Sequence, residues 1–391
     1  MDATATGGVL RFFSGLPDPR TGHHVTHKLH DLIVIAVLAV ICGADGWVQV
    51  QLWGKCKHRW LATFLDLPGG IPSHDTFGRV FALLDPDAFE RRFLAWTASV
   101  VELSGGRLVS IDGKSIRRSF EHGWDRSGMA HLVSAFVSRG DNRLVVSQAA
   151  VADKSNEIGA IPKLLGLLDL TGAVVTIDAI GCQRHVAGKI VAGGGDYLLP
   201  VKDNQPTLLN RVSRLLDDLV LDHTKGGSDG TRVGYHEQAE AGHGRVETRR
   251  VWVSDDVRWL GEDLLGAWPG LTGGSVALFE RVRQDLGDFS GRVSVERQYY
   301  ISSLGGLDAG AIAGYGRGHW SVENNLHWQL DVSFGEDQRR IRKGHGAENY
   351  SRLTRIALNL LKCDTSTKAG IKAKRLNAGW DHDYLLRLIS A

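Results

Sequence analysis

Three carboxylates in the sequence occupy positions from which they could hold a metal ion, and two of them end short β-rich runs. Asp112 ends the first run and is followed by Gly113, while Asp178 ends another and is followed by Ala179. A carboxylate at the carboxyl end of a strand projects into the crevice where α/β sheets bind ligands. If the two strands are neighbours, the paired anions need a cation, and Mg²⁺ prefers oxygen ligands. Either residue alone could equally cap a βα loop.

The third carboxylate, Glu323, lies in a segment that also carries two tryptophans. In a helix, a spacing of four would put four polar residues of this segment on one stripe: His319, Glu323, His327 and Asp331. One interpretation assigns Glu323 to a two-metal site, and another makes the histidines and the glutamate zinc ligands. The third interpretation is that these side chains only bridge to neighbouring loops. The order is not HExxH, so metalloprotease geometry does not follow.

Basic residues are concentrated downstream of these carboxylates, although the whole chain of 391 residues has a formal net charge of only +2. Residues 337–375 contain eleven Lys or Arg and three acidic residues, a net charge of +8 in 39 residues. Lys114, Arg117 and Arg118 also follow the first carboxylate. Phosphate backbones attract such patches, although a charge run is often only a solvated face. Metal-binding carboxylates flanked by cations suit phosphodiester chemistry.

Composition and the lack of certain motifs exclude several other classes of protein. Apolar residues make up 43% and charged residues 23% of the chain, as in soluble globular proteins. The longest apolar run, residues 32–42, is shorter than the roughly 20 residues of a spanning helix, and we see no secretory signal. The four cysteines form no CxxC pair, which favours a reducing cytoplasm over a disulfide framework. Walker A and GxSxG motifs are absent from the sequence.

The spacing of apolar residues predicts the helices and strands that must position these residues. Residues 1–100 read as short helices, with an apolar helix over 30–41 and Ser73 as the N-cap of another. From residue 107 the pattern predicts three strands (108–112, 130–138 and 144–151) and then alternating helices and strands up to 201. Residues 226–300 are rich in glycine and charge and alternate like strands, and residues 307–362 are helical again. This order predicts a mixed α/β core.

Seven short motifs occur in a characteristic order: IDGK at 111–114, DKSNEI at 153–158, TIDA at 176–179, VKDNQP at 201–206, GHGRVETR at 242–249, YYISSL at 299–304, and HWSVEN through LDVSF at 319–334. Together they closely resemble the H-repeat-associated (ISAs-type) insertion-sequence transposases of bacteria. Residues 18–20 and 72–76 are similar to the helical domain that precedes the catalytic core in that family.

The resemblance implies a DDE enzyme with an α/β, ribonuclease H-like mixed-sheet core interrupted by a β-rich insertion. The catalytic and metal-binding triad would be Asp112, Asp178 and Glu323, with two Mg²⁺ or Mn²⁺ ions per active site. The implied domains are an all-α N-terminal domain over 1–104 that could bind DNA, core segments over 105–225 and 305–391, the second ending in a basic segment, and the insertion over 226–304.

The implied reaction is cleavage at transposon ends followed by strand transfer into target DNA, with no covalent protein–DNA intermediate. The partners would be double-stranded DNA, both ends and target, and a second copy of the chain when the ends are paired. No membrane partner is implied, and we expect the protein in the bacterial cytoplasm at the nucleoid. The alternatives are a catalytically inactive, transposase-derived DNA-binding protein and a metal-dependent nuclease that does not join strands.

The expected DNA contacts combine the basic residues with polar residues of the motifs: Lys114, Arg117, Arg118, Lys202, Gln205, His319, Asn324, His327, Arg339, Arg342 and Lys343. One departure affects this set. Wider related transposases carry Tyr, Arg and Lys at fixed spacing around the glutamate. Here the Arg position is His319, the Lys position is Leu330, and Tyr315 is displaced by one residue. His319, His327, Arg339 and Arg342 are therefore the substitutes to test.

Overall fold

The computed structural model describes residues 8–21, 25–100, 108–119, 129–139, 142–151, 157–224, 233–242, 244–285 and 293–390. The chain divides into two compact units. The first, here called the helical unit, contains Met1–Glu102, Gly113–Ala160 and Val322–Ala391. The second, the sheet unit, contains Leu103–Asp112 and Ile161–Ser321.

The helical unit begins with a 3₁₀ turn (Val9–Phe13) and short helices, as the sequence predicts. They are α1 (Leu29–Ile41), α2 (Trp47–Cys56), α3 (His58–Leu61), α4 (His74–Leu83) and α5 (Pro86–Val100). The apolar helix predicted over 30–41 is confirmed as α1, which is buried along nearly its whole length. The N-cap is confirmed as well, because Ser73 accepts a hydrogen bond from the Thr76 amide at 3.2 Å.

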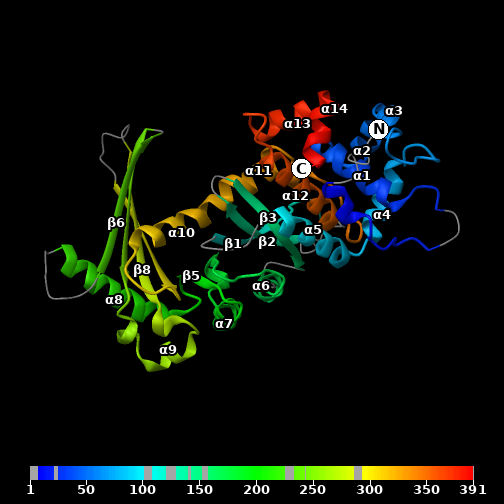
Figure 1. The fold of residues 1–391 in the computed structure, drawn as a ribbon. Coiled ribbons are helices and arrows are strands. Elements are labelled where there is room, and N and C mark those ends of the chain that lie inside the picture. Colours follow the sequence, from blue (N-terminus) through cyan, green and yellow to red (C-terminus); the bar gives the residue numbers. More distant parts are fainter. Residues whose placement is uncertain are drawn as a thin grey trace. The chain divides into compact units, whose positions relative to one another are not determined.

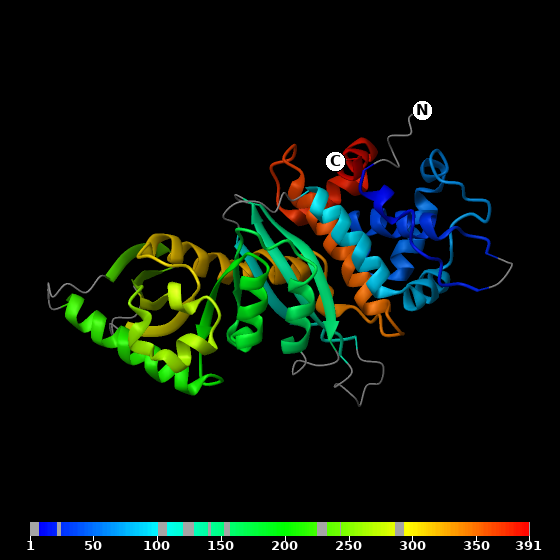
Figure 2. The same ribbon diagram turned by 60° about the horizontal axis from the view of Figure 1, so that its bottom comes forward.

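The remainder of the helical unit comes from later parts of the chain. It holds the hairpin of β2 (His131–Arg139) and β3 (Asn142–Val151), then α11 (Trp328–Val332), α12 (Gly346–Cys363), α13 (Ile371–Trp380) and α14 (His382–Ser390). Helix α12 contacts α1, α4, α5 and β3, and in Figure 2 it lies alongside α5. A helix surrounded in this way is buried on all sides. Its charged residues therefore need partners inside the protein.

In the described part of the chain the strands form a nine-stranded mixed sheet, ordered β3-β2-β1-β4-β5-β9-β8-β7-β6. Strands β1 (Leu108–Ser115), β4 (Val174–Ile177) and β5 (Asp196–Val201) are parallel neighbours. Strand β9 (Val293–Ser302) is antiparallel to β5, and β8 (Ser275–Asp285), β7 (Arg245–Ser254) and β6 (Val233–Gly242) continue the antiparallel part. The mixed α/β architecture predicted from the sequence is therefore confirmed.

The sheet unit contains five α-helices in the described ranges, and two of them, α8 and α10, pack on its antiparallel strands. The five are α6 (Glu157–Leu165, whose first turn belongs to the helical unit), α7 (Arg184–Ala192), α8 (Pro206–Thr224), α9 (Glu262–Ala267) and α10 (Ala309–Val322). Tyr299 donates to Asp217 of α8 at 2.9 Å, while the next residue, Tyr300, packs with Ala309 and Ile312 of α10. Since successive strand residues face opposite sides, α8 and α10 lie on opposite faces (Figure 1).

Residues 226–300, which the sequence predicts to be mainly β, contain strands β6 to β9 in the described ranges. No helix in the described ranges is long and apolar enough to cross a membrane. The short helices and strands predicted up to residue 201 are also present, with ends shifted by a few residues.

Candidate active site

The first two candidate carboxylates occupy matching positions on neighbouring parallel strands, but β1 continues to Ser115 and so does not end at Asp112 as the sequence predicts. In the β1–β4 register, Ile111 pairs with Ile177, and Asp112 and Asp178 are the residues that follow them. Two residues earlier, the hydroxyls of Ser110 and Thr176 are hydrogen-bonded at 3.1 Å, so these side chains share one face. Because side chains alternate along a strand, Asp112 and Asp178 project on that same face. The sheet thus places two carboxylates on adjacent strands, about 5 Å apart at the backbone.

The chain that follows Asp178 is fixed by the turn after β5. The Asn204 side-chain amide donates to the Ala179 carbonyl at 2.7 Å. Gln205 donates to the Cys182 carbonyl at 3.0 Å and to the Gln183 side chain at 3.3 Å. Gln205 was expected to contact DNA, but its amide is engaged in holding this loop. Lys202 in the same turn is exposed.

His319 of α10 lies over the same face of the sheet. Its Nδ1 is 3.1 Å from the Thr176 hydroxyl, two residues before Asp178. Burial lowers the pKa of His319 to about 4, so the imidazole is neutral near pH 7 and offers no positive charge to a phosphate. His319 is better described as a contact between α10 and β4 than as a cationic DNA contact.

Glu323 begins a turn of π-helix, Glu323–His327, that joins α10 to α11. Its side chain is exposed. Glu323 belongs to the helical unit, whereas Asp112 and Asp178 belong to the sheet unit. The next residue, Asn324, has a side chain outside the described part of the structure. Leu330, at the position where wider relatives carry lysine, is fully buried in the core of the helical unit.

Lys114, expected on the DNA surface, is instead enclosed by carboxylates of the helical unit. Its ammonium pairs with Asp331 and lies 3.7 Å from Glu336 and 3.9 Å from Asp337, and only 9% of the residue is exposed. Burial opposes ionisation of Glu336, but the charges of Arg355, Arg339 and Lys114 outweigh it and hold the pKa of Glu336 at about 2. Lys114 is thus an internal counter-ion of the segment that follows Glu323.

A buried hydrogen-bonded chain lies directly behind the residue that follows Asp112. His131 bonds to Ser115 through Nδ1 at 2.7 Å and to Glu157 through Nε2, and both His131 and Glu157 are buried. A Cβ added to Gly113 would lie 2.6 Å from the Glu157 carboxylate and 2.9 Å from His131 Nε2. Glu157 belongs to one of the seven motifs, whose residues 153–156 lie outside the described part of the chain, but no sequence signal indicates His131.

Much of the basic segment over 337–375 turns out to be internal. Five of its cations are buried: Arg339, Arg352, Arg355, Lys374 and Arg375. The basic surface is therefore smaller than the net charge of +8 predicts. Each of the five has partners inside the protein. Arg352 pairs with Glu90 at 2.7 Å and Arg355 with Glu336 at 2.7 Å, while Arg339 donates to Thr354 at 2.7 Å. The local net charge of a sequence segment did not reveal acidic partners distant in the sequence.

Three cations of this segment, Arg340, Arg342 and Lys343, border a groove of about 1030 Å³ within the helical unit. Its lining comes from α2, α4 and the loop before α12 and includes four basic residues: Arg79, Arg340, Arg342 and Lys343. Arg79, Arg340 and Lys343 are exposed and have no ion-pair partner among the described residues. Of the two acids on its lining, Asp45 pairs with Arg375. The groove therefore carries excess positive charge.

The other expected DNA contacts in the helical unit differ in how exposed they are and in whether they are charged. Arg117 and Arg118 are exposed. Arg117 pairs with Asp337 at 3.1 Å, and the Arg118 carbonyl accepts from Arg342 at 3.2 Å. For His327, burial, reinforced by the charges of Lys114 and Arg355, lowers the pKa to about 4. It is neutral near pH 7, like His319.

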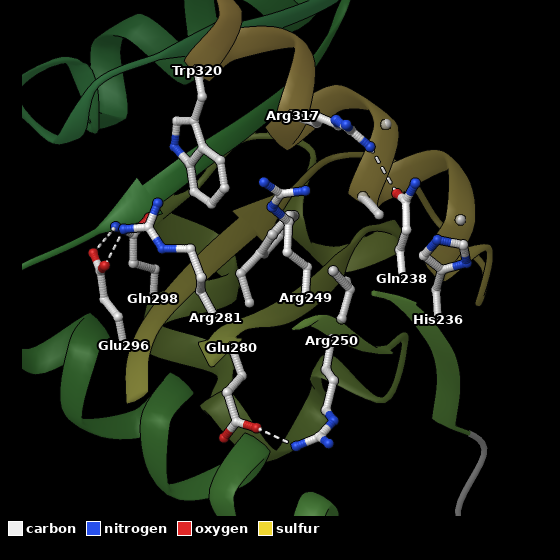
Figure 3. A pocket seen from close by; sticks show the side chains of 15 residues that line it. His236, Gln238, Arg249, Arg250, Glu280, Arg281, Glu296, Gln298, Arg317 and Trp320 are labelled. Carbon is white, nitrogen blue, oxygen red and sulfur yellow. Dashed lines mark hydrogen bonds and ion pairs between the residues drawn. The ribbon is translucent and has the colours of Figure 1, made fainter. Parts of the chain in front are cut away.

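A separate pocket of about 220 Å³ lies in the sheet unit between the antiparallel strands and α10 (Figure 3). The Arg281 guanidinium lies 5.4 Å from the Trp320 ring and pairs with Glu296. Arg317 donates to Gln238 at 2.8 Å, and Arg250 pairs with Glu280 at 3.2 Å. Since these arginines are already paired, the pocket is not a strongly cationic surface.

The two aspartates on these strands fit a hard divalent cation, because such a cation takes carboxylate oxygens as ligands. Asp112 and Asp178 supply two such groups from adjacent strands. Among the described residues, no group of three or more His, Cys, Asp or Glu side chains is clustered to hold a metal. The sheet by itself therefore provides two carboxylate ligands for a metal ion.

The structure presents two aspartates on parallel strands of a mixed α/β sheet, and comparison with known sequences identifies the family. Residues 103–360 match the family described as "Transposase DDE domain", and residues 10–97 match "DDE_Tnp_1-associated". The chain belongs to the DDE transposase family. Members of this family act on DNA and generally use a divalent metal ion.

Relatives that match almost the whole chain support this assignment. The "Putative transposase YncI" of Escherichia coli O157:H7 is 39% identical over 98% of this chain and 94% of the relative. The "H repeat-associated putative transposase YhhI" of Escherichia coli K12 is 36% identical over 98% and 97%. The resemblance found in the sequence motifs is thereby confirmed. A shorter relative, 38% identical over 18% of this chain and 86% of its own length, is named "Inactive transposase YbfQ".

Proposed function

We propose that this chain is the transposase of a bacterial insertion sequence, cleaving DNA at the ends of the element and joining them to target DNA. The observation that carries the proposal is the pair Asp112, within β1, and Asp178, directly after β4, at matching positions of two neighbouring parallel strands in a chain of the DDE family. Glu323 completes the proposed triad by resemblance to the family.

The proposed ligands of two Mg²⁺ or Mn²⁺ ions are Asp112 and Asp178 for a shared ion and Glu323 for the second. When bound, such ions hold the attacking and leaving oxygens of a phosphodiester and lower the pKa of an attacking water. The protein's own part is orientation. The β1–β4 register fixes the two aspartates, Asn204 fixes the chain after Asp178, and His131 with Glu157 supports the chain after Asp112.

The domain scheme is part of the proposal. We assign residues 1–104 to a helical domain, 105–225 and 305–391 to a ribonuclease H-like core, and 226–304 to an insertion. The parallel order β1-β4-β5 supports a core of this kind, and strands β6 to β9 account for the β-rich composition of the inserted part.

The proposed DNA contacts are the accessible cations. They are Arg79, Arg340, Arg342 and Lys343 of the groove in the helical unit. Arg117 and Arg118, which follow Asp112 in the sequence, and Lys202, in the turn that follows β5, complete the set. Lys114 and Arg339 are buried and ion-paired or hydrogen-bonded, and we assign them to structure. Double-stranded DNA, as transposon end and as target, is the proposed substrate, and a homodimer would hold two ends together.

The test uses a DNA duplex that carries the sequence flanking this gene at either end of the element. We expect Asp112→Ala, Asp178→Ala and Glu323→Ala each to abolish nicking in Mg²⁺ while binding of the duplex is kept. Asp218→Ala, at an exposed aspartate of α8 in the sheet unit, is the matched control and should cleave normally. Nicking retained by any of the three variants would refute the assignment of that residue.

Two outcomes would favour the alternative functions. Binding of the duplex without cleavage by the unmodified protein, in either Mg²⁺ or Mn²⁺, would indicate an inactive relative, a possibility raised by the relative named inactive. Cleavage without joining of a pre-cut end to target DNA would indicate a nuclease.

A further inference from the structure

The helix that carries Glu323 contains a local departure from α-helical geometry. Residues Glu323–His327 form a π turn between α10 and α11. A π turn accommodates one extra residue, so the main-chain hydrogen bonds shift from i→i+4 to i→i+5. Single π turns are uncommon and often occur at functional sites. This one begins at the proposed catalytic glutamate.

One side chain from another element holds this turn through its main chain. Lys362, near the end of α12, donates from Nζ to the Asn325 carbonyl at 2.8 Å. The same ammonium donates to the Arg143 carbonyl of β3 at 2.8 Å and lies 4.9 Å from the Phe136 ring of β2. It has no carboxylate partner among the described residues. Lys362 therefore links the π turn to two strands and a helix of the same unit.

The helix after the π turn is anchored independently. Leu330 of α11 is fully buried in the core of the helical unit, and Asp331 is paired with Lys114. An α-helix rotates by about 100° per residue. If the π turn relaxed to α-helix while this anchor held, the residues before it would rotate by about 100° relative to the core, and Glu323 would point elsewhere.

We infer that Lys362 is a positioning residue for Glu323, because it stabilises the π turn that sets the direction of that carboxylate. The inference rests on the proposed function, in which Glu323 holds a metal ion. It does not require Lys362 to touch DNA or metal. The loss of Lys362 should therefore weaken use of the metal and loosen the turn while leaving DNA binding intact.

The test compares Lys362→Met, which keeps the length and apolar stem but removes the donors, with Lys368→Met, an exposed lysine just beyond α12. Hydrogen exchange of peptides covering 320–330, measured without metal, should be faster in Lys362→Met and unchanged in Lys368→Met. The Mg²⁺ concentration for half-maximal cleavage should rise about tenfold in Lys362→Met, the scale typical of groups that orient metal ligands. The dissociation constant for the end duplex should stay within about a factor of two of that of the unmodified protein.

Further variants separate a positioning role from a general loss of stability. Lys362→Arg retains N–H donors and should restore protection of the turn and part of the Mg²⁺ dependence. If Lys362→Met is less stable, all proteins are compared at a temperature where each is folded, and faster exchange confined to the 320–330 peptides supports the inference.

Unchanged exchange over 320–330, or an unchanged Mg²⁺ requirement in Lys362→Met, would overturn the inference. Asp112→Ala and Glu323→Ala are measured in parallel. If they lose cleavage while Lys362→Met behaves like the unmodified protein, the proposed function stands and only this inference fails. If they retain cleavage, the proposed function itself fails.

Discussion

At the scale of the residue, burial keeps two histidines near the proposed site neutral, His319 and His327, and this has a consequence for stability. The pKa of His319 is lowered to about 4 by burial, and the pKa of His327 is lowered to about 4 by burial and neighbouring cations. The unfolded chain therefore binds more protons than the folded one between about pH 6.5 and pH 4. From these two groups we expect the free energy of unfolding to fall as the pH falls through this range.

The measurement is urea unfolding at several pH values between 7.5 and 4.5. His327→Gln should flatten the decline, because one of the two titrating groups is gone, whereas His185→Gln, at an exposed histidine on α7, should leave it unchanged. Equal pH dependence in the unmodified protein and in His327→Gln would contradict the expectation.

A second prediction at this scale concerns the glycine after Asp112. Gly113→Ala would place a Cβ 2.6 Å from the Glu157 carboxylate and 2.9 Å from His131, and this buried pair cannot move freely. Overpacking of this kind costs about 1–3 kcal/mol of unfolding free energy, so the urea midpoint should fall. Gly159→Ala in α6, where a Cβ meets nothing within 4 Å, should instead be neutral or stabilising by up to about 1 kcal/mol. Equal effects of the two substitutions would show that the pair is not rigid.

At the scale of the element, α12 behaves as a core helix in spite of its charges. Arg352 and Glu90 of α5 are almost fully buried and lie 2.7 Å apart, and Glu90 also accepts from Ser147 and the Gln148 amide. Removal of one partner of a buried pair leaves an uncompensated charge and costs about 3–5 kcal/mol. We therefore expect Arg352→Met to lower the unfolding free energy by about that amount.

The double variant Arg352→Met with Glu90→Gln should lose less stability than the sum of the two single variants, because the orphaned charge is removed. Urea unfolding of the four proteins gives the coupling energy directly. Strict additivity would mean that the pair does not contribute as a unit.

At the scale of the whole molecule, the distribution of accessible charge decides where DNA can bind. In the described part of the helical unit, the groove lined by Arg79, Arg340 and Lys343 combines the N-terminal helices with the loop before α12. We expect alanine at these three positions to weaken binding of any duplex. The slope of log affinity against log salt should fall by about one for each phosphate that the variant no longer neutralises.

The matched control is Lys55→Ala, an exposed lysine of α2 that does not line the groove. Binding is measured by fluorescence anisotropy from low to moderate salt. An unchanged slope in the triple variant would place the DNA elsewhere on the protein.

The sequence determined the local structure and the family of the chain. Alternating and helical periodicity located α1 and the strands that carry Asp112 and precede Asp178, because backbone preference and burial pattern are encoded within a few residues. Ser73 marked a helix start because an N-cap needs only the next three residues. The motif order assigned the family for the same reason, since it requires residue types and spacing but no contacts.

The tertiary structure decided which residues are neighbours and which charges are neutralised. The pairing of Asp112 with Asp178 depends on β1 lying beside β4, and nothing in either segment specifies that order. Arg352 lies 262 residues beyond Glu90, so a run of basic residues read as a surface in sequence becomes a set of internal ion pairs. His131, the π turn and Lys362 acquire their roles in the same way. A local pattern fixes the secondary structure, but burial and charge compensation depend on contacts between segments far apart in the chain.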